Sequence, residues 1–272
     1  MVTVRVKVTV RKNNMHQNIF CNMIKSILKK IKRNLLILKN QGDEVFCPIC
    51  NSKFKIFGNF GNPARVNALC YKCNSLERHR LLWLYLNNKT NLPNNFPKRL
   101  LHFAPELSFY SIFSNTDFID YYPCDFSPER YNYKGNARVH KVDITQIPFE
   151  ENYFDVIICN HVLEHIIDDR LAMRELYRVL KPNGWAYLQV PIEENRETTF
   201  EDPTIISPID RENVFGQNDH VRIYGQDYKN RLESVGFEVT RDEFINSFSK
   251  NEIYRYGLMQ DEYIYLAKKN SA

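Results

Sequence analysis

The sequence predicts an α/β fold, in which a doubly wound, mostly parallel sheet with an antiparallel last strand follows a small N-terminal zinc-binding module. Residues 154–191 contain an apolar run, an amphipathic helical stretch and a second apolar run, the pattern of two parallel strands joined by a helix. Strand-like runs at residues 237–241 and 262–267 have no helical pattern between them, which favours an antiparallel pair. Two Cys-x-x-Cys pairs in the first hundred residues have the spacing of a structural zinc site.

The composition is that of a globular protein with a strongly basic first part. The 272 residues suffice for one α/β domain and a smaller module. We expect a cytoplasmic protein, because no apolar run approaches the roughly 20 residues of a membrane span and no secretory signal pattern is present. Residues 1–100 hold 19 Lys and Arg against 3 acids, whereas residues 101–272 hold 18 against 29. Such a basic part is attracted to nucleic acid or to an anionic membrane surface.

Residues 1–44 are predicted to be a basic extension. Alternating valines in residues 2–10 predict either a strand or a segment outside the fold. In residues 18–39, apolar residues recur at helical spacing and basic residues fill the other face, which predicts an amphipathic helix. Three roles are open for this helix: packing on the protein, peripheral contact with the inner membrane face, or contact with a phosphate backbone.

Residues 45–97 are predicted to form a zinc module with a linking helix. Cys47, Cys50, Cys70 and Cys73 form two pairs separated by 19 residues, and four thiolates close a tetrahedral site with no position left for water. We therefore expect a structural zinc ion, which would let a short segment fold without a large core. The alternative is four free thiols that fall in this array.

The linking helix is predicted at residues 75–86, with Ser75 as its cap. Its apolar end should dock on the following domain. Arg78 and Arg80 would then lie near the junction, where they either contact an anion or are solvated.

Motifs within residues 100–269 resemble the class I S-adenosylmethionine-dependent methyltransferases of type 11. The run Asn160-His161-Val162-Leu163-Glu164-His165 follows an apolar strand, and residues 174–184 read Arg-Glu-Leu-Tyr-Arg-Val-Leu-Lys-Pro-Asn-Gly before the next one. Both are similar to the segment between the fourth and fifth strands of that superfamily. The resemblance implies a Rossmann-like catalytic domain at residues 98–272, with S-adenosylmethionine as cofactor.

The resemblance also implies cofactor-binding residues at the carboxyl ends of the strands, where ligands of such sheets bind. The candidates are Ala104, Glu106, Asp125, Asp143, Ile144 and Asn160. Ala104 opens the turn after the first strand, where the family has a glycine-rich sequence, although this chain has no glycine between Gly61 and Gly135. Glu106 would meet the cofactor's ammonium group.

The remaining candidates follow the next strands. In the family's pattern Asp125 would accept hydrogen bonds from the ribose hydroxyls, Asp143 from the adenine amino group, and Ile144 would lie against the ring. Asn160 lies on the rim of the site. Each carboxylate has an ordinary alternative as a cap or loop residue.

The catalytic candidates are His220, His161 and Asp219. Residues 193–225 interrupt the regular alternation of elements, and a loop of this length is usually a lid or binding loop. His220 lies in it, beside Asp219, and an imidazole can take a proton near neutral pH. We predict His220 or His161 as the proton acceptor; a structural Asp and His are the alternative.

We predict methyl transfer to a glycan or another small hydroxyl acceptor, because the second half of the chain is acidic and its long loop is polar. The alternatives are an RNA acceptor bound by the basic zinc module and a non-catalytic zinc-containing binding protein. The residues after Cys159 lack the paired prolines and aromatic used by related enzymes for a planar amino group, so adenine amino methylation does not fit. Cys159, within an apolar strand, should be buried and inert.

Overall fold

The computed structural model describes residues 24, 27–90, 92, 98–133 and 137–271. The strand predicted at residues 2–10 lies outside them, as does the first part of the predicted basic helix. Among the described residues, no helix has the length and apolar character needed to cross a membrane.

The centre of the molecule is a seven-stranded sheet with the order β12-β13-β9-β8-β5-β6-β7. The strands are β5 (Lys98–Phe103), β6 (Ile119–Asp125), β7 (His140–Lys141), β8 (Phe154–Asn160), β9 (Leu180–Gln189), β12 (Glu238–Asp242) and β13 (Ile264–Lys268). The strands from β5 to β9 pair in parallel, whereas β13 is antiparallel to both β9 and β12. The predicted α/β sheet with an antiparallel last strand is confirmed.

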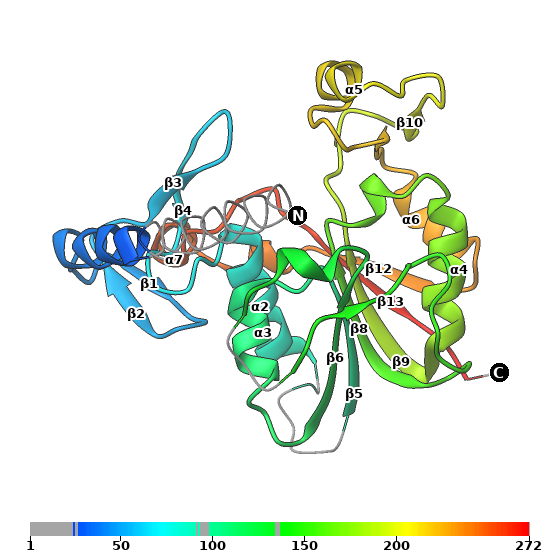
Figure 1. The fold of residues 1–272 in the computed structure, drawn as a ribbon, viewed down its shortest axis with the longest axis horizontal. Helices are drawn as coiled ribbons and strands as arrows, with labels where there is room; N and C mark the ends of the chain where they lie inside the picture. The colour runs from blue at the N-terminus through cyan, green and yellow to red at the C-terminus, as the bar shows by residue number, and fades with distance from the viewer. Residues whose placement is uncertain (1–23, 25–26, 91, 93–97, 134–136, 272) are drawn as a thin grey trace, which may run out of the picture.

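Helices cover both faces of the sheet (Figure 1): α2 (Glu77–Lys89) and α3 (Leu107–Phe113) lie on one, and α4 (Asp169–Val179) and α6 (Tyr228–Glu233) on the other. Successive residues of a strand point to opposite faces. Leu100 accordingly belongs to the core under α2 and α3, whereas Leu101 belongs to the core under α4 and α6. The sheet is therefore doubly wound, and the linking helix α2 docks on it as predicted.

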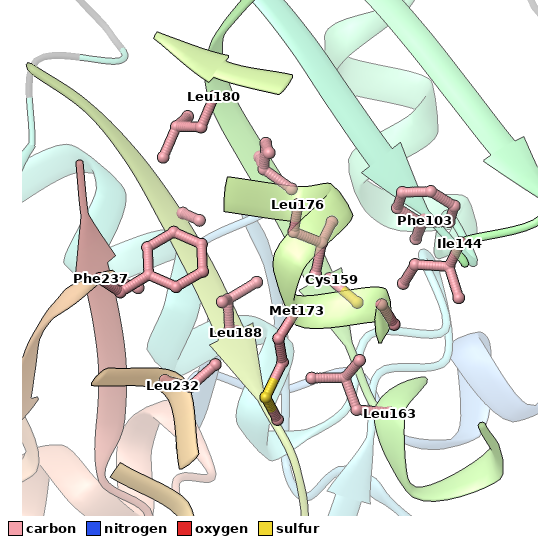
Figure 2. Close-up of a cluster of buried hydrophobic side chains, with 14 of the residues drawn as sticks. Phe103, Ile144, Cys159, Leu163, Met173, Leu176, Leu180, Leu188, Leu232 and Phe237 are labelled. Carbon is pink, nitrogen blue, oxygen red and sulfur yellow. The ribbon is translucent and has the colours of Figure 1, made fainter. Parts of the chain in front are cut away.

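Figure 2 shows the core under α4 and α6, where Cys159 lies among Leu163, Met173 and Leu176. Cys159 is 1% exposed, and burial raises the pKa of its thiol well above the ordinary range. A protonated, buried thiol is a poor nucleophile, which agrees with the inert role expected for it.

A helix that the sequence analysis did not predict lies between the last two strands. This helix, α7 (Lys250–Tyr256), begins with a capping box: the Glu252 amide donates to the Ser249 hydroxyl, and the Ser249 amide donates to the Glu252 carboxylate at 2.8 Å. The Ser-x-x-Glu pattern was the available sequence signal. The helix packs against β1 (Val45–Cys47), so it attaches the end of the chain to the N-terminal region.

The four-cysteine module consists of two small hairpins, at the end of the molecule coloured blue in Figure 1. β1 pairs with β2 (Ser52–Phe54), and β3 (Gly58–Phe60) pairs with β4 (Arg65–Leu69). A helix at residues 27–39 precedes them, and its Ile37 packs against their small core. Leu36 is also half-buried, and the other apolar side chains of residues 27–39 are exposed, so packing on the described protein covers only a small part of the helix.

Residues 193–225, termed the lid segment, carry β10 (Phe200–Glu201), α5 (Pro208–Phe215) and β11 (Arg222–Ile223). Figure 1 shows α5 and β10 projecting beyond the end of the sheet. Hydrogen bonds anchor the segment: Tyr224 donates to Asp169 of α4 at 2.7 Å, and Arg231 of α6 donates to Glu201 at 3.3 Å. The lid segment is therefore a folded unit held against α4 and α6.

Candidate active site

A cavity of about 900 Å³, termed the edge cavity, lies at the carboxyl ends of β8 and β9. Four parts of the chain line it: His161 follows β8, Arg65 comes from the β3–β4 hairpin, His220 from the lid segment, and Glu262 from the residues before β13. Parallel sheets bind ligands at this edge. The four-cysteine module and the lid segment therefore supply walls of the place where a ligand is expected.

Charged side chains of both signs face the edge cavity. Arg78 lines it with a buried Nε atom that has no hydrogen-bond partner among the described residues. Across the lining, Glu262 is a largely buried acid, and burial raises the pKa of its carboxyl. Buried polar groups without partners are uncommon in proteins, so this cavity suits a polar ligand that can supply hydrogen bonds.

The turn after β5 has the backbone geometry for which the family pattern uses glycine. Ala104 takes a φ of 48°, in the left-handed region that only small or local hydrogen-bonding residues occupy readily. Alanine here is the smallest side chain after glycine. The turn shape implied by the resemblance is therefore present without its glycines.

Glu106 is engaged by the protein itself. Its carboxylate accepts hydrogen bonds from His102 Nε2 at 3.0 Å and Asn160 Nδ2 at 2.5 Å, and His79 Nε2 lies 3.3 Å away. Burial raises the pKa of the Glu106 carboxyl, but the charges and hydrogen bonds of His79 and His102 outweigh burial and hold it well below its usual value. Glu106 thus ties α2 to the sheet edge rather than presenting a free carboxylate.

One polar atom of Asn160 is available to a ligand. Its Oδ1 is buried and has no hydrogen-bond partner among the residues that the structure describes, while its amide nitrogen is occupied by Glu106. An unpartnered acceptor at the end of β8 fits a donor such as the ammonium group of S-adenosylmethionine. Ala104 and Asn160 are the two candidates whose geometry fits the cofactor directly.

The other cofactor candidates have local contacts. Asp125 accepts from the Ser127 amide and from the Tyr131 hydroxyl, both at 2.7 Å, so ribose hydroxyls would have to share or replace Tyr131. Asp143 accepts from the amide and hydroxyl of Thr145, the ordinary turn contact weighed above. Ile144 is 2% exposed and belongs to the core under α4 and α6.

The catalytic candidates come together, with different partners from those predicted. His161 Nδ1 lies 3.2 Å from Glu164 Oε1. His220 packs edge to face on His165, with ring centroids 4.7 Å apart. Asp219 faces His165 instead of His220, with 3.5 Å between its Oδ2 and Nδ1 of His165. His161 and His220 both line the edge cavity.

The contacts of His79, His102 and His165 with acidic partners were not predicted from the sequence. His102 lies within an apolar strand and His79 within a helix of the neighbouring module, so no local pattern joins either to Glu106. His165 was visible in the Glu164-His165 run, but its partner Asp219 is more than 50 residues away. Only the fold brings these groups to one place.

The four cysteines also come together. Sγ atoms of Cys47 and Cys73 are 3.6 Å apart, as are those of Cys50 and Cys70, and none of the four forms a disulfide. Four sulfurs about 2.3 Å from a tetrahedral zinc ion would be about 3.8 Å from one another. The residues present therefore fit zinc.

Comparison with known proteins places a methyltransferase domain in this chain. Residues 109–188 match a family model described as a methyltransferase domain. Ubiquinone/menaquinone biosynthesis C-methyltransferase UbiE of Idiomarina loihiensis is 42% identical over 50 residues, 18% of this chain and 20% of that protein. The UbiE protein of Vibrio campbellii is 38% identical over 50 residues, 18% and 19% of the two chains. The match thus spans about one fifth of these curated relatives.

Solved structures with a similar chain path were also found. A complex of the Haloferax volcanii Trm112 methyltransferase activator with a methyltransferase has a TM-score of 0.49 and 14% identity, covering 70% of this chain and 89% of that chain. The YcgJ protein of Bacillus subtilis has a TM-score of 0.45 and 16% identity, covering 71% and 100%.

The family match and the sheet order agree with each other. The α/β part of the chain contains a match to a methyltransferase domain at residues 109–188, within a doubly wound sheet. The four-cysteine module precedes the matched residues.

Proposed function

We propose that this protein transfers the methyl group of S-adenosylmethionine to a hydroxyl group of a glycan or another small polar acceptor bound in the edge cavity. The observation that supports this most is the cavity itself, which is lined by His161 and by charged groups of both signs. Its volume of about 900 Å³ is in the range of small-molecule sites. Two of its walls come from the β3–β4 hairpin and the lid segment, which suit the enclosure of a small ligand better than contact with a long nucleic-acid backbone.

The cofactor, when bound, supplies a methyl group on a positively charged sulfur. The Ala104 turn and Asn160 Oδ1 would hold its amino-acid part, and Asp125 would accept from its ribose. The cofactor would thus supply its methyl group to the acceptor oxygen in a single displacement. The chain's contribution is alignment of the two reactants and removal of the hydroxyl proton.

His161 is the proton acceptor that geometry favours, with His220 as the second candidate. Glu164 lies beside Nδ1 of His161 and can stabilise the imidazolium that forms. His161 has a φ of 55°, and its amide donates to the Gln189 carbonyl at 2.8 Å, so its strained backbone is held by the neighbouring strand. Such strain is common at active sites.

The zinc ion is proposed to be structural, held by Cys47, Cys50, Cys70 and Cys73. Its role would be to shape the module whose β3–β4 hairpin forms one cavity wall. The exposed basic residues of the helix at residues 27–39 favour RNA as the second candidate acceptor, bound outside the cavity.

The test incubates the protein with methyl-labelled S-adenosylmethionine and separate pools of oligosaccharides, small polar metabolites and RNA. Label in an oligosaccharide or metabolite that survives base treatment supports the proposal, because methyl ethers resist hydrolysis. Label in RNA alone would contradict it.

A variant of the lid tests the cavity as the acceptor site. Gln217→Trp, on the lid wall of the cavity, should raise the acceptor KM without changing cofactor affinity. Ile209→Trp, on the exposed side of α5, is the matched control.

A further inference from the structure

Three potential metal ligands meet at one side of the edge cavity. One ligand atom each from Glu164, His165 and His220 lies within 4.8 Å of the others. Glu164 and His165 belong to a short 3-10 helix after β8, Leu163–His165, and His220 comes from the lid segment. All three line the edge cavity, so a bound ion would face the ligand that the cavity holds.

The Glu164 carboxylate lacks the partners that its burial demands. The residue is 1% exposed, and neither carboxylate oxygen has a hydrogen-bond partner among the described residues. His161 is close to it, with Nδ1 3.2 Å from Oε1, and forms an ion pair with it when protonated. A buried carboxylate with so few partners is destabilising. A cation between Glu164 and the two histidines would compensate it.

His165 is oriented so that its Nε2 atom can offer a lone pair to a cation. Nδ1 of His165 lies 3.3 Å from the Asp219 carbonyl oxygen and 3.5 Å from its carboxylate. Because a carbonyl only accepts hydrogen bonds, this contact requires the proton on Nδ1, and Nε2 has no hydrogen-bond partner among the described residues. A carboxylate behind a ligating imidazole is the usual support of metal-bound histidine.

The cluster is rigidly held. Arg222, 3% exposed, donates to the carbonyl oxygens of Leu163 and Ile167 at 2.9 and 2.8 Å, on both sides of the turn with Glu164 and His165. The Val221 amide donates to the Glu164 carbonyl oxygen at 2.9 Å. The same short lid strand thus fixes the turn and delivers His220, so the donors are positioned before any ion binds.

We propose that Glu164, His165 and His220 bind a divalent cation of the first transition row, with Asp219 as the residue that positions His165. Two imidazoles and one carboxylate suit zinc, iron(II), cobalt(II) or manganese(II) and leave coordination positions open. The open positions face the edge cavity. Resting on the proposed function, an acceptor oxygen could occupy one of them, and His220 would then be a ligand, leaving His161 to take the proton.

The test measures metal binding without cofactor or acceptor, so that its failure is separate from failure of methyl transfer. Full-length protein loaded with zinc at the cysteines is titrated calorimetrically with cobalt(II) and manganese(II), and zinc is measured in parallel. We expect one further equivalent per chain, with a cobalt spectrum free of the intense thiolate absorption of a four-cysteine site. No further equivalent would overturn the proposal.

Variants assign the site. Glu164→Gln and His220→Asn should each weaken the second binding by about 100-fold or more, and Asp219→Asn by about 10-fold. His140→Asn, on exposed β7, is the matched control. Retained zinc and a cooperative thermal transition show that a variant is folded. If either of the first two variants does not fold, His165→Asn, with a 30% exposed side chain, replaces it. Unchanged affinity in the folded variants would refute the site.

Discussion

At the scale of single residues, the carboxyl edge of the sheet is defined by polar atoms that the fold buries without partners. Asn160 Oδ1, both Glu164 oxygens and Arg78 Nε are in this state among the described residues. His79 Nε2 and Ser108 Oγ are also without a hydrogen-bond partner in the part of the chain that the structure describes, whereas Glu106 at the same edge and the buried Arg80 of α2 are fully engaged. Since unpartnered buried groups are costly, their concentration at one edge indicates where ligands complete the structure.

The role of Asp125 in cofactor binding can be tested by substitution. Asp125→Ala should weaken S-adenosylmethionine binding by about 1 to 3 kcal/mol, the usual cost of losing a charged hydrogen-bond partner. Titration calorimetry measures this directly. Tyr131→Phe is the control, because it removes the present contact to Asp125 while leaving the carboxylate; its binding should be equal or tighter. Equal affinity of Asp125→Ala and the unsubstituted protein would remove Asp125 from the cofactor site.

Kinetic measurements on single variants distinguish the roles of His161 and His220. His161→Asn should lower kcat by about 100-fold or more with nearly unchanged cofactor affinity, because it removes the proton acceptor. His220→Asn should also lose activity, but excess metal should restore part of it if His220 is a ligand.

The pH profile adds a second criterion for these residues. Burial lowers the pKa of His220 below its ordinary value of 6.5, so a neutral His220 persists to lower pH than a free imidazole. If His220 were the base, kcat would fall only below pH 6.5. An unaltered kcat in His161→Asn would show that His161 is not the proton acceptor.

At the scale of elements, α2 is the structural link between module and domain. Arg80, with no exposed surface, donates to the carbonyls of Ser75, Ala68 and Gly257 at 2.9, 2.9 and 2.6 Å, and its guanidinium lies over Phe57. It is neither solvated nor an anion contact, the two roles considered from sequence. Ser75, predicted as the cap of this helix, does not cap it. Its hydroxyl contacts the Cys47 and Cys73 thiols, and α2 begins after Leu76.

Arg80→Lys should lower the free energy of unfolding by about 2 to 4 kcal/mol, because an ammonium cannot reach carbonyls on three elements and stays buried. Denaturant unfolding followed by fluorescence measures this. Arg99→Lys is the control, because Arg99 has a 44% exposed side chain and a weak surface ion pair with Asp120, at 3.8 Å. This substitution should change the free energy of unfolding by under about 0.5 kcal/mol. Equal effects would mean that the carbonyl contacts contribute little.

Zinc removal tests the module as a unit. Purified protein should hold one zinc at the cysteines, Cys70→Ser should lose it, and Cys124→Ser, a buried cysteine outside the cluster, should keep it. Because metal binding is coupled to folding, chelation should lower the melting temperature. Metal content well below one equivalent, unchanged by Cys70→Ser, would contradict zinc binding by the module.

The elements differ in how far sequence could predict them. β5, β6, β8 and the β8–α4–β9 unit follow from apolar runs and helical spacing, because local pattern and burial coincide there. Helix α7 was missed because its seven residues bury none completely, so only its capping box marks it. The pairing of Glu106 with His79 and of Asp219 with His165 depends on contacts across elements, which no local pattern encodes.

At the scale of the whole molecule, charge and exposed apolar surface both concentrate at the N-terminal end. The helix at residues 27–39 carries Lys29, Lys30, Lys32 and Arg33 in exposed positions. On the same helix Ile31 and Leu35 are 50% and 61% exposed. A basic helix with an uncovered apolar face is suited to lie in the surface of an anionic bilayer, while the cavity-bearing domain stays in water.

We therefore expect the protein to sediment with vesicles that contain anionic phospholipid and to be released as salt increases, because salt screens the attraction of the lysines. Ile31→Ser combined with Leu35→Ser should reduce binding at least about 10-fold, since each removes apolar surface from the bilayer. Ile206→Ser combined with Ile209→Ser, which removes even more exposed apolar side chains from the lid segment, is the control for nonspecific adhesion. Equal loss in both variants would show that the vesicles bind exposed apolar surface in general. Binding to RNA without binding to vesicles would assign the basic end to nucleic acid instead.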